Sequence, residues 1–449
     1  MDNSKQATLE LGTKPVGKLL MQYALPAIAA MTAASLYNMT DSIFIGQGCG
    51  ALAISGLAIT FPLQNLGAAF GAGVGVGAST CISVKLGQKD YQTAERVFGN
   101  AVTLNLIIGI AFSIITLLFL NPILKFFGAS DATLPYAREY MVVTLAGNVI
   151  SHMFFGMNAI LRAASKPRSA MMASVMTVIL NAILSPIFIW PLHMGIRGAA
   201  LATIIAQFCV LMWQLRIFSN PQCIVHFKRG IYRPMKHIIK NIIAIGMSPF
   251  AMNVCSCIII IFINNALTHH GGDLAVGAFG ICNKIVFIFV MINMGMNQGM
   301  FPIAGYNYGA HNYDRLTTVL KYTMVIAFCI TTLGWVVAQT LPHECARLFT
   351  TDETLIKIAE RAIHITMLVF PVVGIQMVCT GFFQSIGKAK VSMLLSLSRQ
   401  LLFFLPMLII LPNFYQVDGV WMAQPISDVI SVVVAVVMLT NYIKKLKTT

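Results

Sequence analysis

Charged residues are scarce in this chain of 449 residues: only 10% are Asp, Glu, Lys or Arg, with 15 acids against 30 bases. About a quarter of the residues of a soluble domain are usually charged. With 57% apolar residues and a mean hydropathy of +0.78, the chain has too little polar sequence to cover a core. These deficits exclude a soluble globular protein and predict an integral membrane protein.

The usual signatures of catalysis are also missing. The sequence contains no G-x-x-x-x-G-K-[ST] run for binding nucleotides, no cluster of metal-ligating residues and no nucleophile–base pair. Its ten cysteines lie mostly within apolar segments, which does not suit a disulfide framework. The sequence therefore argues against an enzyme, against ATP as the energy source and against a bound cofactor.

What the sequence does contain is a series of apolar runs of about 20 residues, the length that spans a bilayer as a helix. Gly, Pro, Asn and charged residues separate these runs, and the ~10-residue alternating segments of a membrane barrel are absent. We predict twelve spanning helices at 15–42, 51–84, 94–121, 134–162, 168–190, 195–216, 238–266, 274–306, 316–341, 355–386, 391–411 and 417–442.

The distribution of basic residues predicts the orientation in the membrane. When the loops are assigned alternately to the two sides, 23 Lys and Arg residues fall on the side of the N-terminus and six on the other, while Lys284 alone falls inside a helix. By the positive-inside rule, both termini are cytoplasmic. The net charge of +15 follows from this topology, so it gives no reason to expect a nucleic-acid partner.

The two halves of the chain repeat one another at a constant spacing, at which Gly77 meets Gly299 and the helix break at 165–168 meets the break at 387–390. Each half has six helices, and because six is even the repeats are parallel. The predicted fold class is an all-α integral membrane protein with twelve transmembrane helices in two parallel six-helix repeats around a central cavity. The predicted segments are a tail at 1–14, a half at 15–216, a linker at 217–237, a half at 238–442 and a tail at 443–449.

Asp41 is a carboxylate within or at the end of the first apolar run. An ionised acid is costly in hydrocarbon, so such residues usually face an internal cavity and mark an ion or substrate pathway. We interpret Asp41 as the residue that binds the coupling ion of a transporter. The alternative is that Asp41 lies at the lipid–water interface and caps a neighbouring segment.

Other residues inside the predicted helices are also candidates. Asp428 lies deeper in a helix than any other acid, and it either has a functional role or pairs with a basic residue to fix packing. Lys284 is the one cation inside a predicted helix, and the sequence leaves open whether the two meet. His152 and His364 are interpreted as packing residues, with a proton relay as the alternative. Pro26 removes a backbone hydrogen bond within the first helix and is a predicted hinge.

Four groups of residues, spread over the whole chain, carry a family resemblance. They are Ala24-Leu25-Pro26-Ala27 with Asn38-Met39-Thr40-Asp41, Ile160-Leu161-Arg162-Ala163 with Lys166-Pro167-Arg168, Gly295-Met296-Asn297-Gln298-Gly299 with Gly305-Tyr306-Asn307-Tyr308-Gly309-Ala310, and Gly419-Val420-Trp421-Met422-Ala423-Gln424-Pro425. Together they resemble the MATE (multidrug and toxic compound extrusion) family, and within it the bacterial multidrug-efflux branch.

The resemblance implies an antiporter that exports amphipathic, often cationic drugs and toxins by alternating access, driven by an inward gradient of H⁺ or Na⁺. It also implies that Asp41, Asn181 and Thr203 line a cavity in the N-terminal half. Ser185 stands where many relatives have an Asp. We expect these four residues, together with Asp428, to take part in ion coupling. Sodium generally needs several oxygen ligands and a proton needs one titratable group, so the missing second acid favours protons.

The residues expected to bind substrate are Asn158, Tyr37, Met172 and Gln298, although Asn158 and Asn181 have an alternative role as hydrogen-bonding residues between helices. The expected partners are small amphipathic molecules and membrane lipid, and the expected state is a monomer in the bacterial cytoplasmic (inner) membrane. The alternative function is a flippase for lipids or lipid-linked sugars on a related fold. A flippase would need a strongly basic cavity for a pyrophosphate head group.

The charge distribution makes a prediction about topology. A reporter fused within the 217–237 linker should be cytoplasmic, and one fused within 269–273 should be external, because only the first segment belongs to the strongly basic side. Enzymatic reporters that are active on one side of the membrane measure this directly. The opposite labelling pattern would contradict the orientation derived from charge.

Overall fold

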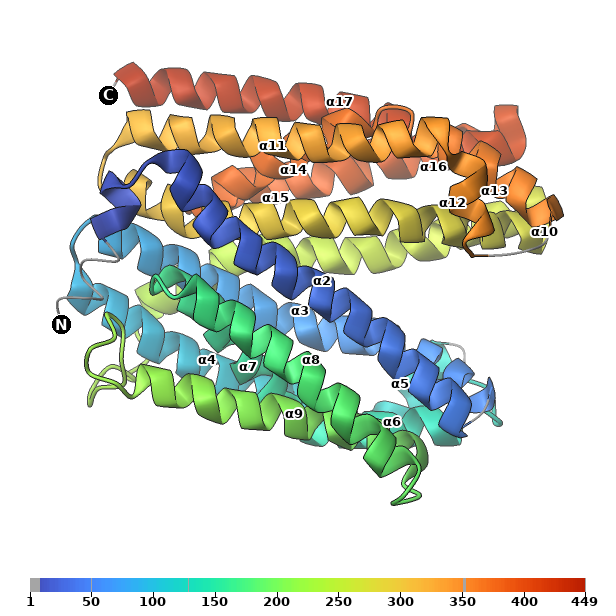
Figure 1. Ribbon diagram of the computed structural model, residues 1–449, viewed down its shortest axis with the longest axis horizontal. Coiled ribbons are helices and arrows are strands. Elements are labelled where there is room, and N and C mark those ends of the chain that lie inside the picture. Colours follow the sequence, from blue (N-terminus) through green and yellow to red (C-terminus); the bar gives the residue numbers. More distant parts are fainter. Residues whose placement is uncertain (1–8, 50, 128, 350–352, 449) are drawn as a thin grey trace. The chain divides into compact units, whose positions relative to one another are not determined.

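The computed structural model describes residues 9–49, 51–127, 129–349 and 353–448, without the side chains of 34–43 and of some further helical residues. The described chain is almost entirely helical and contains no strand (Figure 1). Helices suit a bilayer because they satisfy every backbone N–H and C=O within one segment. The predicted all-α class is confirmed.

The helices of the first half are α2 (Val16–Cys49), α3 (Ala51–Gly87), α4 (Tyr91–Leu118), α5 (Leu120–Phe126), α6 (Leu134–Ala146), α7 (Asn148–Ala163), α8 (Pro167–Ile189) and α9 (Gly195–Phe218). Those of the second half are α10 (Lys236–Gly309), α11 (Tyr313–Thr340), α12 (Pro342–Arg347), α13 (Glu353–Thr366), α14 (Phe370–Ser385), α15 (Ala389–Leu397), the π-helix η1 (Ser398–Phe404), α16 (Leu405–Ile410) and α17 (Pro412–Thr448). Non-helical backbone interrupts α10 at Gly272 and α17 at Gln416.

Most of these helices are long and apolar enough to cross a membrane. Among the described residues nine single spans meet this test, and two bent pairs raise the number to 11. The apolar α2 provides the twelfth span, so the predicted number is confirmed. The fourth and tenth predicted helices, however, are bent by 57° between α6 and α7 and by 54° between α13 and α14.

The predicted repeat is present in the structure in the same register. The helix α4 at Tyr91–Leu118 corresponds to α11 at Tyr313–Thr340, with both ends matching residue for residue. The second helices of the bent pairs match in the same way, at Asn148–Ala163 and Phe370–Ser385. Both halves therefore place the same bends and breaks at equivalent positions.

The turns before α4 and α11 show this match in detail. Lys89 and His311 occupy equivalent positions of the two repeats, and their φ angles are 59° and 56°. The next residues, Asp90 and Asn312, each accept a hydrogen bond from the backbone N–H three residues on. Hydrogen bonding to Thr93 also lowers the pKa of the Asp90 carboxyl. The same capping chemistry therefore starts the same helix in both halves.

Contacts divide the chain into two compact units. Unit 1 contains Ala29–Phe250 and the described residues before Pro15, while unit 2 contains Pro15–Ile28 and Ala251–Thr449. The boundaries within α2 and α10 again fall at equivalent positions of the repeats, and each of these helices begins in one unit and continues in the other. Each sequence half therefore contributes one helical segment to the unit formed by the other half.

Glycines allow these exchanged segments to pack closely. In unit 1, a Cβ atom on Gly246 of α10 would lie 2.2 Å from the carbonyl oxygen of Gly73 in α3. In unit 2, a Cβ atom on Gly299 of α10 would lie 2.6 Å from the Cα atom of Ala24 in α2. No side chain fits at these distances, and small residues are what lets helix backbones approach this closely in membranes.

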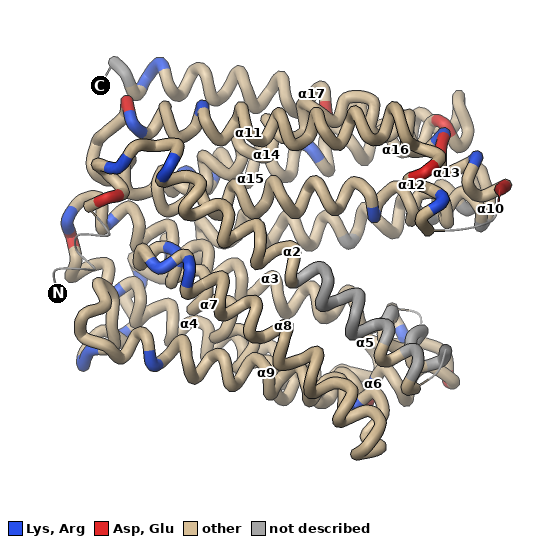
Figure 2. The backbone as a smooth tube through the Cα atoms, in the orientation of Figure 1, with Lys and Arg blue, Asp and Glu red and all other residues tan. Residues whose placement is uncertain are grey.

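Charged residues lie mainly near the ends of the helices, with few along their middles (Figure 2). Each unit contains an ion pair: Lys228 Nζ lies 3.3 Å from a carboxylate oxygen of Glu95 in unit 1, and Arg361 pairs with Asp418 in unit 2. This distribution fits a protein whose helix middles lie in hydrocarbon.

The close approach at Gly246 makes a prediction about stability. Gly246→Ala should lower the free energy of unfolding by about 1–3 kcal/mol, because the added methyl group overpacks the contact with Gly73. Gly280→Ala is the matched control in the same helix, since nothing lies within 4 Å of its Cβ position. Thermal unfolding of the purified proteins in detergent measures both changes, and equal unfolding temperatures for the two variants would contradict the packing argument.

Candidate functional site

Three of the residues expected to take part in ion coupling are joined by hydrogen bonds in unit 1. Asn181 and Ser185 are four residues apart on α8 and so share one face of the helix. The Ser185 hydroxyl donates to Asn181 Oδ1 at 3.1 Å, and Asn181 Nδ2 donates to Thr203 Oγ1 of α9 at 3.0 Å. Asn181 and Ser185 are buried. The arrangement joins α8 to α9 through neutral groups, and its part in ion coupling stays a prediction.

Asp41 and Tyr37 lie on α2, but their side chains are outside the described residues. The backbone nevertheless places Asp41 in the helix. The helix α2 continues to Cys49, whereas the sequence predicted its end at residue 42. Asp41 therefore lies in the interior of an apolar helix, and its coupling role stays a prediction.

The described residues expected to bind substrate belong to both units, and each is described within its own unit. Asn158 is buried in unit 1, where Nδ2 donates to Ala170 O and Ser174 Oγ of α8 at 3.1 Å and Oδ1 accepts from Arg162 at 2.6 Å. Its amide thus links α7 to α8, which is the alternative role considered for it. Met172 is an exposed residue of unit 1, and Gln298 is a half-buried residue of unit 2.

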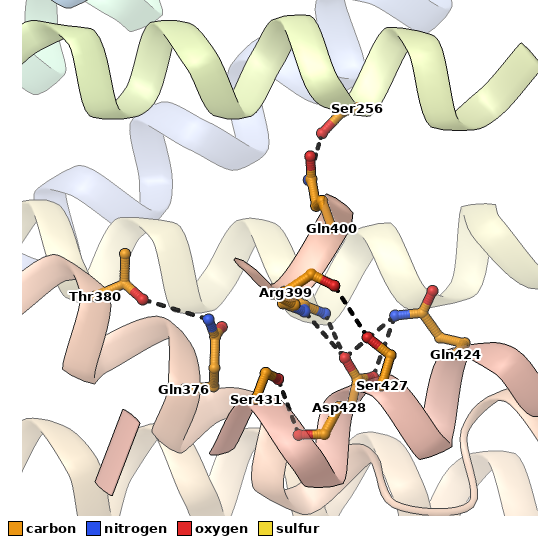
Figure 3. A network of polar contacts seen from close by, with 9 residues as sticks. All are labelled: Ser256, Gln376, Thr380, Arg399, Gln400, Gln424, Ser427, Asp428 and Ser431. Carbon is orange, nitrogen blue, oxygen red and sulfur yellow. Dashed lines mark hydrogen bonds and ion pairs between the residues drawn. The ribbon is translucent and has the colours of Figure 1, made fainter. Parts of the chain in front are cut away.

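The most extensive described polar network surrounds Asp428 in unit 2 (Figure 3). Asp428 is only 4% exposed, and its Oδ1 atom lies 2.9 Å from Nη2 and 3.0 Å from Nε of Arg399. Gln424, one turn earlier on α17, places Nε2 3.3 and 3.2 Å from the two carboxylate oxygens. An acid and a base that balance each other in this way are far less costly in a membrane than either would be alone.

Arg399 belongs to the π-helix η1, a rare geometry that occurs frequently at functional sites. Widening the helix disturbs its regular hydrogen bonds, and Ser427 of α17 donates a hydrogen bond to the Arg399 carbonyl at 3.1 Å. The next residue, Gln400, donates through Nε2 to Ser256 Oγ of α10 at 2.9 Å. The π-helix is therefore tied to α10 and α17 on either side of the ion pair (Figure 3).

This network answers a question that the sequence left open and corrects one conclusion. Asp428 pairs with Arg399, whereas Lys284 lies over the ring of Phe349, 5.3 Å from its centroid. Lys284 is also not alone inside a helix, because Arg399 lies in the middle of the span at Ala389–Ile410. Counting loop charges had assigned Arg399 to the cytoplasmic side. Its position within the predicted helix at 391–411 was the signal that could have identified it.

The described residues contain no group of three or more His, Cys, Asp or Glu side chains that could hold a metal ion. The two histidines of the predicted helices differ in their surroundings. His364 places Nδ1 2.9 Å from Gln339 Oε1, and its own carbonyl accepts from Gln339 Nε2. His152 of α7 is 1% exposed and faces α3 and α4.

Comparisons with known proteins agree over the whole chain. A family model described as MatE matches residues 26–187 and 246–410. The multidrug export protein MepA of Staphylococcus haemolyticus is 27% identical over 413 residues, which cover 92% of this chain and 91% of that protein. MepA of Staphylococcus aureus is 27% identical over 406 residues, which cover 90% of this chain and 89% of that protein. The solved outward-facing conformation of a multidrug resistance MATE family transporter of the MOP superfamily has a TM-score of 0.93, 26% identity and 98% coverage of both chains.

The ion pair makes a prediction about stability. Arg399→Leu or Asp428→Leu alone should each lower the free energy of unfolding by about 3–5 kcal/mol, because each leaves one charge buried without its partner. The double variant should recover most of this loss. Unfolding of all four proteins in detergent completes a double-mutant cycle, and additive losses would show that the two residues do not stabilise each other.

Proposed function

Because the chain belongs to the MatE family of transporters, we propose that it exports amphipathic, often cationic drugs and toxins across the membrane that its helices span. The observation that carries this proposal is the similarity to multidrug export proteins over 92% of the chain, which includes both repeats. Transport in this family requires no catalytic residues in the chain, in agreement with the sequence analysis.

We further propose that inward movement of protons drives export and that Asp41 carries them. The choice of protons over sodium rests on Ser185, which stands where many relatives have a second acid; the described hydrogen bonds of Asn181 reach only the hydroxyls of Ser185 and Thr203. A separate observation bears on which acid carries the protons. The other candidate acid, Asp428, already has its charge balanced by Arg399, so it would have to leave that partner before it could exchange an ion. Asp41 is then the acid best suited to the role.

We propose that transport occurs by alternating access to the two sides of the membrane, and that bending of α2 near Pro26 is part of the switch. Pro26 cannot donate the backbone hydrogen bond of its position, which weakens the helix there. It lies two residues before the boundary at Ile28, where α2 passes from unit 2 to unit 1. A bend at this point would act on the part of α2 that carries Asp41, so protonation and shape are linked through one helix.

A flippase is supported less well by the described residues. It would need cations free to bind a pyrophosphate group. Of the two basic residues noted within spans, Arg399 is paired with Asp428 and Lys284 lies over the ring of Phe349. Neither forms a basic surface of the kind a flippase would need.

The proposal predicts that Asp41→Asn abolishes coupled export, because an amide keeps the shape of the acid but cannot take up or release a proton. Export of a fluorescent cation by everted vesicles under an imposed pH gradient measures this effect. Asp131→Asn makes the same chemical change at an exposed loop position of unit 1 and should leave export unchanged. Normal export by Asp41→Asn at equal expression would remove Asp41 from the mechanism, and export driven only by a sodium gradient would overturn the choice of ion.

A further inference from the structure

In unit 1, His152 of α7 faces α3 and α4, and both of these helices have a glycine opposite its side chain. The helix α3 faces α7 with a glycine on each successive turn, at Gly67, Gly71 and Gly75. A Cβ atom on Gly71 would lie 3.0 Å from the Cα atom of His152. The imidazole is therefore held against the backbone of α3 in the interior of the unit.

The helix α4 packs against the same region through a reciprocal contact. Asn105 of α4 lies over Gly156 of α7, where an added Cβ atom would be 2.5 Å from Asn105 Nδ2. His152 of α7 lies over Gly109 of α4, where an added Cβ atom would be 3.5 Å from His152 Nδ1. Asn105 and Gly109 are one turn apart on α4, and His152 and Gly156 are one turn apart on α7. Asn105 and His152 therefore lie one helical turn apart along the same α4–α7 interface.

These two side chains are buried without the partners that they need. Asn105 is 0% exposed and His152 is 1% exposed. Within the described part of the chain, neither amide atom of Asn105 and neither ring nitrogen of His152 makes a hydrogen bond, although the Gly67 carbonyl is an acceptor beside the ring. Buried polar groups of native proteins are nearly always hydrogen-bonded, and ordered water is the usual partner where the protein supplies none.

The other repeat shows that the helix crossing itself does not need these residues. The positions of Asn105 and His152 correspond to Ala327 and Gly374 in unit 2, where an added Cβ atom on Gly374 would lie 2.7 Å from the Ala327 carbonyl oxygen. The position of Gly71 corresponds to Asn293, whose Nδ2 donates to the Phe289 carbonyl. Unit 2 thus places an amide at this crossing, and unit 1 alone places an ionisable ring there.

An apolar cavity of about 680 Å³ lies close to this site in the same unit. It is formed by α3, α4 and α5, and the topology predicted from charge places α5 toward the outer side. Phe112 lines the cavity, and its ring centroid is 6.3 Å from that of His152 at an angle of 31°. Phe112 therefore borders both the cavity and the buried imidazole.

We propose that His152 and Asn105 form a water-containing proton site in unit 1, which is reached from the outer side past Phe112. In the binding step, a hydronium ion gives its proton to the neutral imidazole and becomes water, and the ring becomes imidazolium. The acceptors Asn105 Oδ1 and Gly67 O, with the bound water, would hold the charged ring. Proton binding at His152 stands on this geometry alone, whereas its use in export rests on the proposed function.

Among the described side chains, no charged one provides an alternative explanation for proton binding at this level. The helix α7 and its neighbours α3, α4, α6, α8 and α9 carry charged residues only within two turns of their ends, at Lys85, Glu95, Arg96, Arg138, Glu139, Arg162, Arg168, Arg197 and Arg216. The charge on α7 itself, Arg162, is ten residues or about 15 Å along the helix from His152. Asp41, the remaining acid of interest, has no described side chain.

The test is nuclear magnetic resonance of the full-length protein with ¹⁵N-labelled histidine rings. The resonance that disappears in His152→Gln belongs to His152, and His152→Gly, which takes the residue of unit 2, assigns it independently. We expect this resonance to shift within a titration from about pH 8 down to about pH 3. In Asn105→Ala its midpoint should move, while the resonance of His364, assigned with His364→Gln, should not.

A His152 resonance that stays fixed over the whole range from about pH 8 to about pH 3 would overturn the site. An unchanged midpoint in Asn105→Ala would remove Asn105 from it. Phe112→Ala should speed exchange of the ring proton with water, and an unchanged rate would overturn the route from the cavity. If the resonance titrates but His152→Gln keeps the pH profile of export, the site is real and its use in export is overturned; if export proves to be driven by sodium, the titration still stands.

Discussion

A polar side chain inside a bilayer has to find its partner within the protein, and this constraint explains much of the interior. It accounts for the tight pair between Arg399 and Asp428, whose charges cancel where water is excluded. It also accounts for the amide of Asn158, whose described hydrogen bonds join α7 to α8. Where the described residues leave a buried polar atom without a hydrogen bond, as at Asn105 beside His152, the side chain becomes a candidate for binding something else.

The two repeats share a backbone plan but divide the polar chemistry between them. Helix ends, bends and turn conformations recur at equivalent positions, down to the positive φ angles of Lys89 and His311. The buried side chains do not recur: unit 2 holds the ion pair on a π-helix, and unit 1 holds neutral hydrogen-bonded groups and a buried histidine. A symmetric scaffold with different interiors lets one unit respond to a signal that leaves the other unchanged.

Much of the fold could be predicted because its signals are local. The spans follow from apolar runs of about 20 residues, and the repeat follows from breaks that stand in the sequence. The third helix begins at Tyr91 and not at 94, because Asp90 caps it. The bend at Gly147 and the exchange of segments between units depend on packing, so periodicity did not reveal them. In the candidate site, the resemblance implied that Asn181 and Thr203 line one cavity, and the structure joins the two side chains by a hydrogen bond. The partner of Asp428 was not predicted, because sequence places a charge on a helix without showing which helix it faces.

The exchange of helical segments between the units constrains the order of folding. Residues 15–28 are synthesised early, yet the rest of their unit begins only at Ala251, and unit 1 in turn is incomplete until Phe250 has been made. Contacts this distant in sequence form slowly, because a long loop must close before they contribute. The beginning of α2 therefore cannot pack against the rest of its unit until the intervening helices have been synthesised. Cutting the chain in the linker at 217–237 would give two fragments that are each missing a piece held by the other.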